Sequence, residues 1–191
     1  MLEDTMEGER QPTPRVELYV RSLQPDGYCQ QQTAILDRIA TLVSRGIVAE
    51  QQVHVCGCQV PASRTDATTT AGDVILTRLS EFHAWADRNG CTLAPAIETR
   101  DVRDSLAGSR YRAVRLPALL LAEFRGDELH CVTPHCTGET TVTVPDRVSE
   151  LESGDPREFE SLPDTATTVP PRRVERDVRD TDDDPVQLPG Q

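Results

Sequence analysis

The sequence predicts one α/β domain around a mixed sheet of four or five strands, and three features predict it. Two alternating segments rich in β-forming residues are each followed by a stretch with helical periodicity. Two apolar segments joined by Arg125-Gly126-Asp127 come next and have the composition of a β-hairpin. A short amphipathic stretch ends the pattern, so the predicted order is βαβα, a β-hairpin and a final helix.

The first half of the domain contains two predicted strand–helix units. Residues 16–23 and 51–60 alternate in polarity, as half-buried strands do. Residues 29–45 follow the turn signal Pro25-Asp26-Gly27, and their apolar side chains recur on one helical face. Residues 70–89 have the same periodicity and are the strongest helix prediction in the chain.

The second half is predicted to begin with less regular structure. Residues 92–97 are expected to form a short strand, and residues 98–115 an irregular, arginine-rich loop. Residues 117–124 and 128–132 form the two strands of the predicted hairpin. Residues 145–152 are expected to form the last helix. The domain is therefore predicted to span residues 15–152.

The charge composition is typical of a salt-adapted protein. The chain has 32 acidic residues, 20 arginines and no lysine, which gives a net charge of −12. Carboxylates stay hydrated at molar salt, where the Debye length is about 3 Å and their mutual repulsion is screened. The outer segments 1–14 and 153–191 carry most of the excess negative charge, and we expect both to be disordered.

The N-terminus lacks the basic start and apolar core of a secretory signal. No apolar stretch approaches the roughly 20 residues that a membrane helix needs. We therefore expect a cytoplasmic protein without membrane contact, whose cysteines are reduced thiols.

Two resemblances refine this expectation. The segment VELYVRS, followed by a proline-containing turn and a helix, resembles the first strand and active-site turn of glutaredoxins. Leu116-Pro117 before the hairpin resembles the cis-proline of the thioredoxin-like superfamily. These similarities imply a thioredoxin-like fold over about residues 15–152, with the sheet order 2-1-3-4. A ferredoxin-like sandwich is the alternative.

The segments VELYVRSL, LSEFHAWADRNG, AIETRDVRDSLAGS and LPALLLAEFRGDELHCVTP are similar to a family of short haloarchaeal proteins that often carry a helix-turn-helix label. The label implies a DNA-associated regulator. A three-helix DNA reader presents an exposed recognition helix. In residues 70–89 only Arg78 and Arg88 are available for that role.

Cysteine and histidine residues suggest two further kinds of chemistry. Cys29 lies at the start of the first predicted helix, where a thiolate is stabilised, and is a candidate redox residue. The similarity to glutaredoxins places Gln24 and Gly27 at the dithiol positions, so we expect no dithiol oxidoreductase activity and no catalytic residues.

A zinc site is the second possibility. Its candidate ligands are His130, Cys131, His135 and Cys136. A second cluster, of His54, Cys56 and Cys58, lies on a strand that the order 2-1-3-4 places about 14 Å away, too far for a joint site. The alternative is that the cysteines pack as small apolar groups, and no other cofactor is expected.

An anion site is predicted where arginine interrupts the acidic pattern. Residues 98–115 have a net charge of +2, and guanidinium groups form paired hydrogen bonds to phosphate and carboxylate. The alternative is a solvated loop with internal ion pairs. The candidate ligand-binding residues are Arg100, Arg103, Arg110, Arg112, Arg115 and Pro117.

These features lead to three functional hypotheses. The first is a non-catalytic thioredoxin-like binding or regulatory module for a protein or a small anionic ligand. The second is a helix-turn-helix-type transcriptional regulator that binds DNA. The third is a single-cysteine redox or metal-sensing protein.

Overall fold

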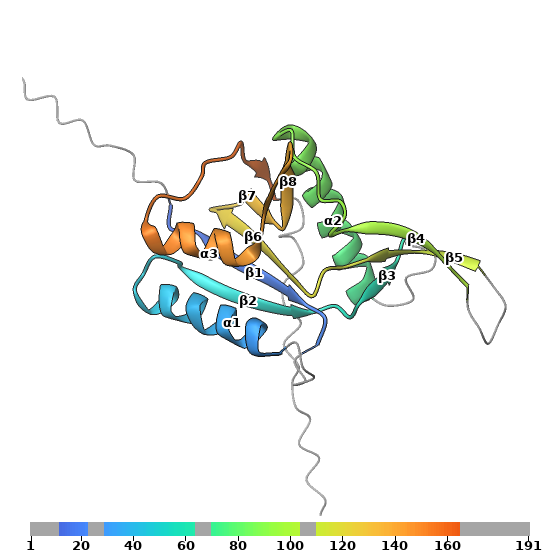
Figure 1. The fold of residues 1–191 in the computed structure, drawn as a ribbon, viewed down its shortest axis with the longest axis horizontal. Coiled ribbons are helices and arrows are strands. Elements are labelled where there is room, and N and C mark those ends of the chain that lie inside the picture. The colour runs from blue at the N-terminus through green and yellow to red at the C-terminus, as the bar shows by residue number, and fades with distance from the viewer. Residues whose placement is uncertain (1–11, 23–28, 64–69, 104–109, 165–191) are drawn as a thin grey trace, which may run out of the picture.

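The computed structural model describes residues 12–22, 29–63, 70–103 and 110–164 (Figure 1). These ranges form a mixed α/β structure of three helices and ten strands. In chain order the elements are β1 (Arg15–Val20), α1 (Cys29–Ser44), β2 (Glu50–Val55), β3 (Gln59–Pro61), α2 (Thr70–Arg88), β4 (Glu98–Arg103), β5 (Arg110–Arg115), β6 (Leu119–Arg125), β7 (Glu128–Thr133), β8 (His135–Thr137), β9 (Thr140–Val142), α3 (Val144–Ser153) and β10 (Leu162–Pro163).

The main sheet has five strands in the order β10-β7-β6-β1-β2. Strands β1 and β2 are parallel, whereas β6 is antiparallel to both of its neighbours, β1 and β7. The four principal strands therefore have the predicted order 2-1-3-4. The predicted hairpin turn is confirmed, since Gly126 has a φ of 59° between β6 and β7.

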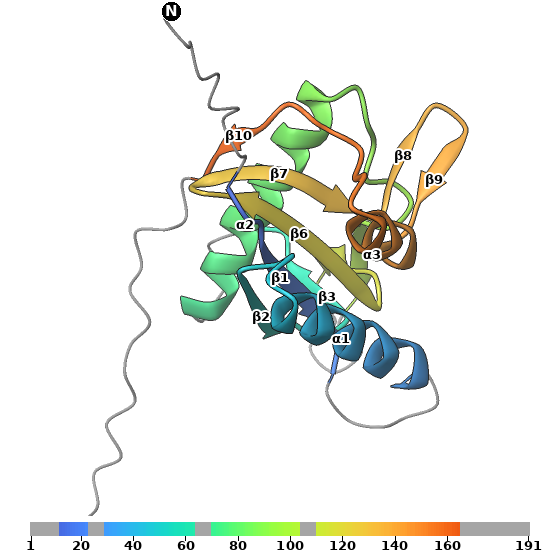
Figure 2. The same cartoon turned by 90° about the vertical axis from the view of Figure 1, so that its left-hand side faces the viewer.

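The helices cover both faces of this sheet. Helix α2 lies on one face, and α1 and α3 lie together on the other (Figure 2). Side chains alternate along β1, so this strand contributes to a hydrophobic core on each face of the sheet. Val16 and Leu18 pack with α1 and α3, whereas Tyr19 packs with Phe82 of α2. Helix α3 begins at a capping box in which Thr143 and Asp146 bond each other's backbone, and it buries Val148 and Leu151.

Several predicted segments differ from the structure. Residues 51–60 were expected to form one strand, but Gly57 has a φ of 74° and separates β2 from β3. Residues 92–97 contribute only one isolated bridge, from Thr92 to Cys136. The peptide bond Leu116-Pro117 is trans, because the described cis bonds are Ala94-Pro95 and Thr133-Pro134. The prediction that Leu116-Pro117 corresponds to the cis-proline of the thioredoxin-like superfamily is therefore wrong.

The arginine-rich segment is not an irregular loop. Strands β4 and β5 are paired over six residues each, and with β3 they form a separate sheet in the order β3-β5-β4. In Figure 1 this pair of strands projects away from the main sheet. We call β4 and β5 together the ribbon.

The packed chain continues beyond the expected boundary at residue 152. Residues 154–164, which we call the strap, run from the end of α3 to β10, which pairs with β7. Phe159 of the strap lies 5.2 Å from Trp85 between ring centres, and the Asp164 side chain is fully buried. No helix among the described residues is long and apolar enough to cross a bilayer.

Candidate functional site

The ribbon gathers three arginines on one of its faces. Directly opposed residues of an antiparallel pair share a face, and side chains alternate along each strand. Arg103 is opposite Arg110, and Asp101 is opposite Arg112. We call the face that carries Arg103, Arg110, Arg112 and Asp101 the arginine face. All four of these residues are exposed.

The pairing of Arg103 with Arg110 is electrostatically unfavourable. Like charges directly opposite each other on a ribbon destabilise it. Among the described residues, no carboxylate lies within ion-pair distance of Arg103, Arg110 or Arg112. A bound anion would supply the missing counter-charge, so the arginine face is suited to phosphate or carboxylate groups.

The remaining residues of the predicted anion site do not join this face. Arg100 lies on the opposite face and binds Glu98, with Nη2 2.6 Å from Oε2. Arg115 is also on the opposite face, across from Glu98. Pro117 lies apart and lines a small apolar pocket with Tyr19 and Cys56. The structure therefore divides the predicted set and leaves three of its arginines together.

A shallow hollow adjoins the arginine face. Its volume is about 370 Å³, and it is lined by Ala62, Ser63, Asp101, Arg110, Tyr111 and Arg112. The Tyr111 hydroxyl accepts a hydrogen bond of 3.4 Å from Gln59 of β3. Tyr111 is opposite Val102, so its ring lies on the other face of the ribbon from the arginine face, where Gln59 holds it.

The arginines of the helices are all bound internally. Arg38 of α1 binds Glu152 of α3, with Nη2 2.7 Å from Oε2. Arg88 of α2 donates a 3.0 Å hydrogen bond to the Ser161 carbonyl. Arg78 and Arg147 are almost completely buried. Helix α2 therefore does not present the arginine pair that a recognition helix would need.

Arg78 belongs to a buried ion-pair cluster under α2. Its Nη2 lies 3.0 Å from Glu17 Oε1 on β1, and its Nη1 lies 2.5 Å from Asp164 Oδ1. Arg15 also binds Glu17. The Tyr19 hydroxyl donates a 2.6 Å hydrogen bond to Glu17, and burial followed by the Glu17 charge raises the pKa of this tyrosine. The cluster fixes the end of the strap to the sheet.

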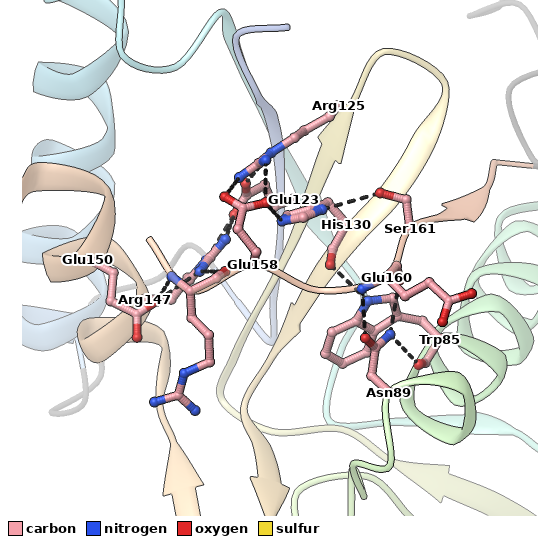
Figure 3. A network of polar contacts seen from close by, with 11 residues as sticks. Trp85, Asn89, Glu123, Arg125, His130, Arg147, Glu150, Glu158, Glu160 and Ser161 are labelled. Carbon is pink, nitrogen blue, oxygen red and sulfur yellow. Dashed lines mark hydrogen bonds and ion pairs between the residues drawn. The ribbon is translucent and has the colours of Figure 1, made fainter. Parts of the chain in front are cut away.

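A second buried cluster lies under α3 (Figure 3). The Nε and Nη2 atoms of Arg147 lie 2.9 and 2.6 Å from one Glu123 oxygen, and neither side chain is exposed to solvent. Arg147 Nη1 also binds Glu150, at 2.8 Å. Arg125 connects Glu123 to Glu158 of the strap, with a distance of 2.7 Å to Glu158. This cluster joins β6, α3 and the strap.

The predicted metal ligands are used in other ways. His130 Nδ1 lies 3.2 Å from the Ser161 hydroxyl, and burial lowers the pKa of its ring. Cys131 is buried in the core, which raises the pKa of its thiol. His135 Nδ1 lies 2.6 Å from the Val132 carbonyl oxygen, and Cys136 Sγ lies 3.3 Å from the Thr141 hydroxyl. Among the described residues, no group of three or more possible ligands could hold a metal ion.

The other predicted cysteine and histidine residues are also separated from these. His54 stacks on Tyr19 with a centroid distance of 4.9 Å, and Cys56 donates a hydrogen bond to the Val20 carbonyl. Strands β1 and β6 separate β2 from β7, as expected. Cys29 is the first residue of α1, and its side chain lies outside the described part of the structure.

Fold and site together define an α/β protein with a projecting arginine ribbon. A family model described as a helix-turn-helix domain matches residues 8–156, and the chain belongs to that family. No curated protein and no solved structure matches. Helices α1 and α2 are separated by β2 and β3, and α2 and α3 by six strands, so the described helices are not consecutive as in a helix-turn-helix unit.

Proposed function

We propose that this protein is a DNA-associated regulator that contacts duplex DNA through the ribbon. The observation that carries the proposal is the arginine face, where Arg103, Arg110 and Arg112 are exposed without a described carboxylate partner. Arginines provide the phosphate contacts on which DNA affinity depends. Membership of a helix-turn-helix family supports DNA as the partner.

The shape of the site also supports this proposal. A two-stranded β-ribbon fits the major groove of B-DNA, which is about 12 Å wide. The ribbon projects from the sheet, so it can enter a groove ahead of the acidic remainder of the chain (Figure 1). Asp101 lies on the same face, opposite Arg112, and a carboxylate in the groove accepts a hydrogen bond from cytosine N4. The face therefore combines phosphate contacts with one group that can distinguish bases.

The domain that carries the ribbon is, in our proposal, a non-catalytic thioredoxin-like module in the cytosol of a salt-adapted cell. The sheet order β7-β6-β1-β2 supports it, as do α2 on one face and α1 and α3 on the other. The thioredoxin-like module would act as a scaffold, with no reaction assigned to it. In this proposal the acidic residues keep the chain soluble at high salt, and the ribbon binds the partner.

A small anionic ligand is the second candidate for the same arginines. The hollow of about 370 Å³ beside Arg110, Tyr111 and Arg112 favours it, because it has room for a phosphate-bearing molecule. The two candidates differ in the molecule that occupies the arginine face, which is duplex DNA in the first and a small anion in the second. A nucleotide-sized anion would bind there without any affinity of the protein for duplex DNA.

The proposal is tested by fluorescence anisotropy of a labelled duplex titrated with the full chain at a series of salt concentrations. Three arginine–phosphate contacts predict a slope of about −2.7 in log affinity against log salt. Absence of duplex binding at the lowest salt concentration at which circular dichroism shows a folded chain, or an affinity that does not change with salt, would contradict DNA as the partner. Inorganic phosphate that binds the arginine face in the absence of duplex affinity would support the small-ligand candidate.

A further inference from the structure

The two edges of the main sheet are unequally protected. At one end β10 has two residues, one of them Pro163, and Asp164 follows it in a buried ion pair. At the other end β2 has six residues and, among the described residues, is paired on one side only, with β1. Figure 2 shows these strands at opposite ends of the sheet. Short strands, proline and charge are the usual protection of an edge, and β10 has them.

Strand β2 lacks these protective features. Its sequence is EQQVHV, so Glu50 at its start is its one acidic residue, and it contains no proline or arginine. Val53 and Val55 lie on the same side of the strand and are 38% and 55% exposed. Among the described residues only one other large apolar side chain, Val74 of α2, is exposed. An open, apolar edge strand is a template for another strand.

We infer that β2 pairs with β2 of a second copy of this chain, antiparallel about a two-fold axis, so that the two sheets become continuous. A two-fold interface must be self-complementary. With Gln52 on the axis, Glu50 lies opposite His54 of the second copy, and Gln51 lies opposite its Val53. No like charges are opposed in this pairing, Val53 is covered by Gln51 of the second copy, and Val55 lies opposite Ala49, just before its β2.

The self-complementary pattern identifies the occupant as a second copy. The exposed part of the chain is strongly acidic overall, so an interface between two copies requires a nearly neutral surface. Strand β2 provides one, since burial lowers the pKa of His54 and keeps its ring neutral near pH 7. The dimer then carries two ribbons related by the two-fold axis.

Sedimentation velocity of the full chain, at the salt concentration in which it is stable, tests this inference. We expect a particle of twice the 21.1 kDa chain mass for the natural protein. Val53→Lys introduces a charge into the strand pair and is expected to raise the dimer dissociation constant by about tenfold or more. Val74→Lys is the matched control, because Val74 is 39% exposed on α2, and it should leave the dimer unchanged.

Circular dichroism of each variant shows whether the domain is folded, and Val55→Lys provides a second, more exposed site on the same strand. A natural protein that stays monomeric up to the highest soluble concentration would overturn the inference. So would folded Val53→Lys and Val55→Lys variants that remain dimers. If the protein binds duplex DNA as a monomer, the dimer inference fails and the proposed function stands. If it forms the dimer but does not bind duplex DNA, the proposed function fails and the dimer inference stands.

Discussion

Replacing Arg147 with leucine is expected to lower the free energy of unfolding by about 3–5 kcal/mol, because it leaves Glu123 charged in the core with part of its pairing removed. Arg147 and Glu123 are both fully buried and are joined by two contacts of 2.9 and 2.6 Å. Arg147 also binds Glu150 of its own helix and the Arg157 carbonyl of the strap. Urea unfolding followed by circular dichroism measures the change.

Arg38→Leu is the matched control, since Arg38 also binds one glutamate through two nitrogens, but in solvent. The Arg38 and Glu152 side chains are 33% and 35% exposed, and such a pair contributes about 0.2–1 kcal/mol. The double variant R147L/E123L should be less destabilised than the sum of its single substitutions, since no uncompensated charge stays buried. Equal effects of Arg147→Leu and Arg38→Leu would contradict the role given to the buried cluster.

Replacing both Arg103 and Arg110 with serine is expected to weaken duplex binding by about tenfold or more and to reduce the salt slope by about two. These two arginines are directly opposed on the arginine face and contribute two of its three guanidinium groups. Their removal should not lower the stability of the ribbon, because it also removes the repulsion between them. Anisotropy titrations across salt, together with thermal unfolding, measure both quantities.

The matched control for this variant is R45S/R157S, which removes the same charge elsewhere. Both residues are exposed, and neither has an ion pair with a described residue. We expect this control to bind duplex DNA with the natural salt slope, apart from a small uniform loss. If both double variants lose the same affinity, general charge rather than the ribbon is responsible.

The regular part of the fold could be predicted because apolar periodicity reports burial directly. Strand β1, helix α1 and the hairpin of β6 and β7 all have such patterns, and they were placed within a few residues. The ribbon is not predicted from the sequence because aspartate is depleted in strands and the segment is densely charged, although R-Y-R-A at the start of β5 alternates. The sequence pattern places the strap in the acidic tail because its acidic side chains look solvated.

The site could be predicted only in part, for a related reason. The sequence shows that residues 98–115 are rich in arginine, but not which arginines find an internal partner. Glu17 and Glu123 lie in apolar strands and pair with helix arginines that are distant in the chain. Those pairings remove Arg78 and Arg147 from the surface. A glutamate within an apolar strand is the one signal in the sequence that an arginine elsewhere in the chain is buried as its partner.

Hydrogen–deuterium exchange of the full chain, with and without a saturating duplex, tests most directly whether the ribbon is the DNA-binding element. The ribbon model predicts that DNA slows exchange in β4 and β5, at residues 98–103 and 110–115, and leaves α2 unchanged. Slower exchange confined to α2 or α1, with no change in β4 and β5, would contradict it and would indicate that a helix binds the DNA.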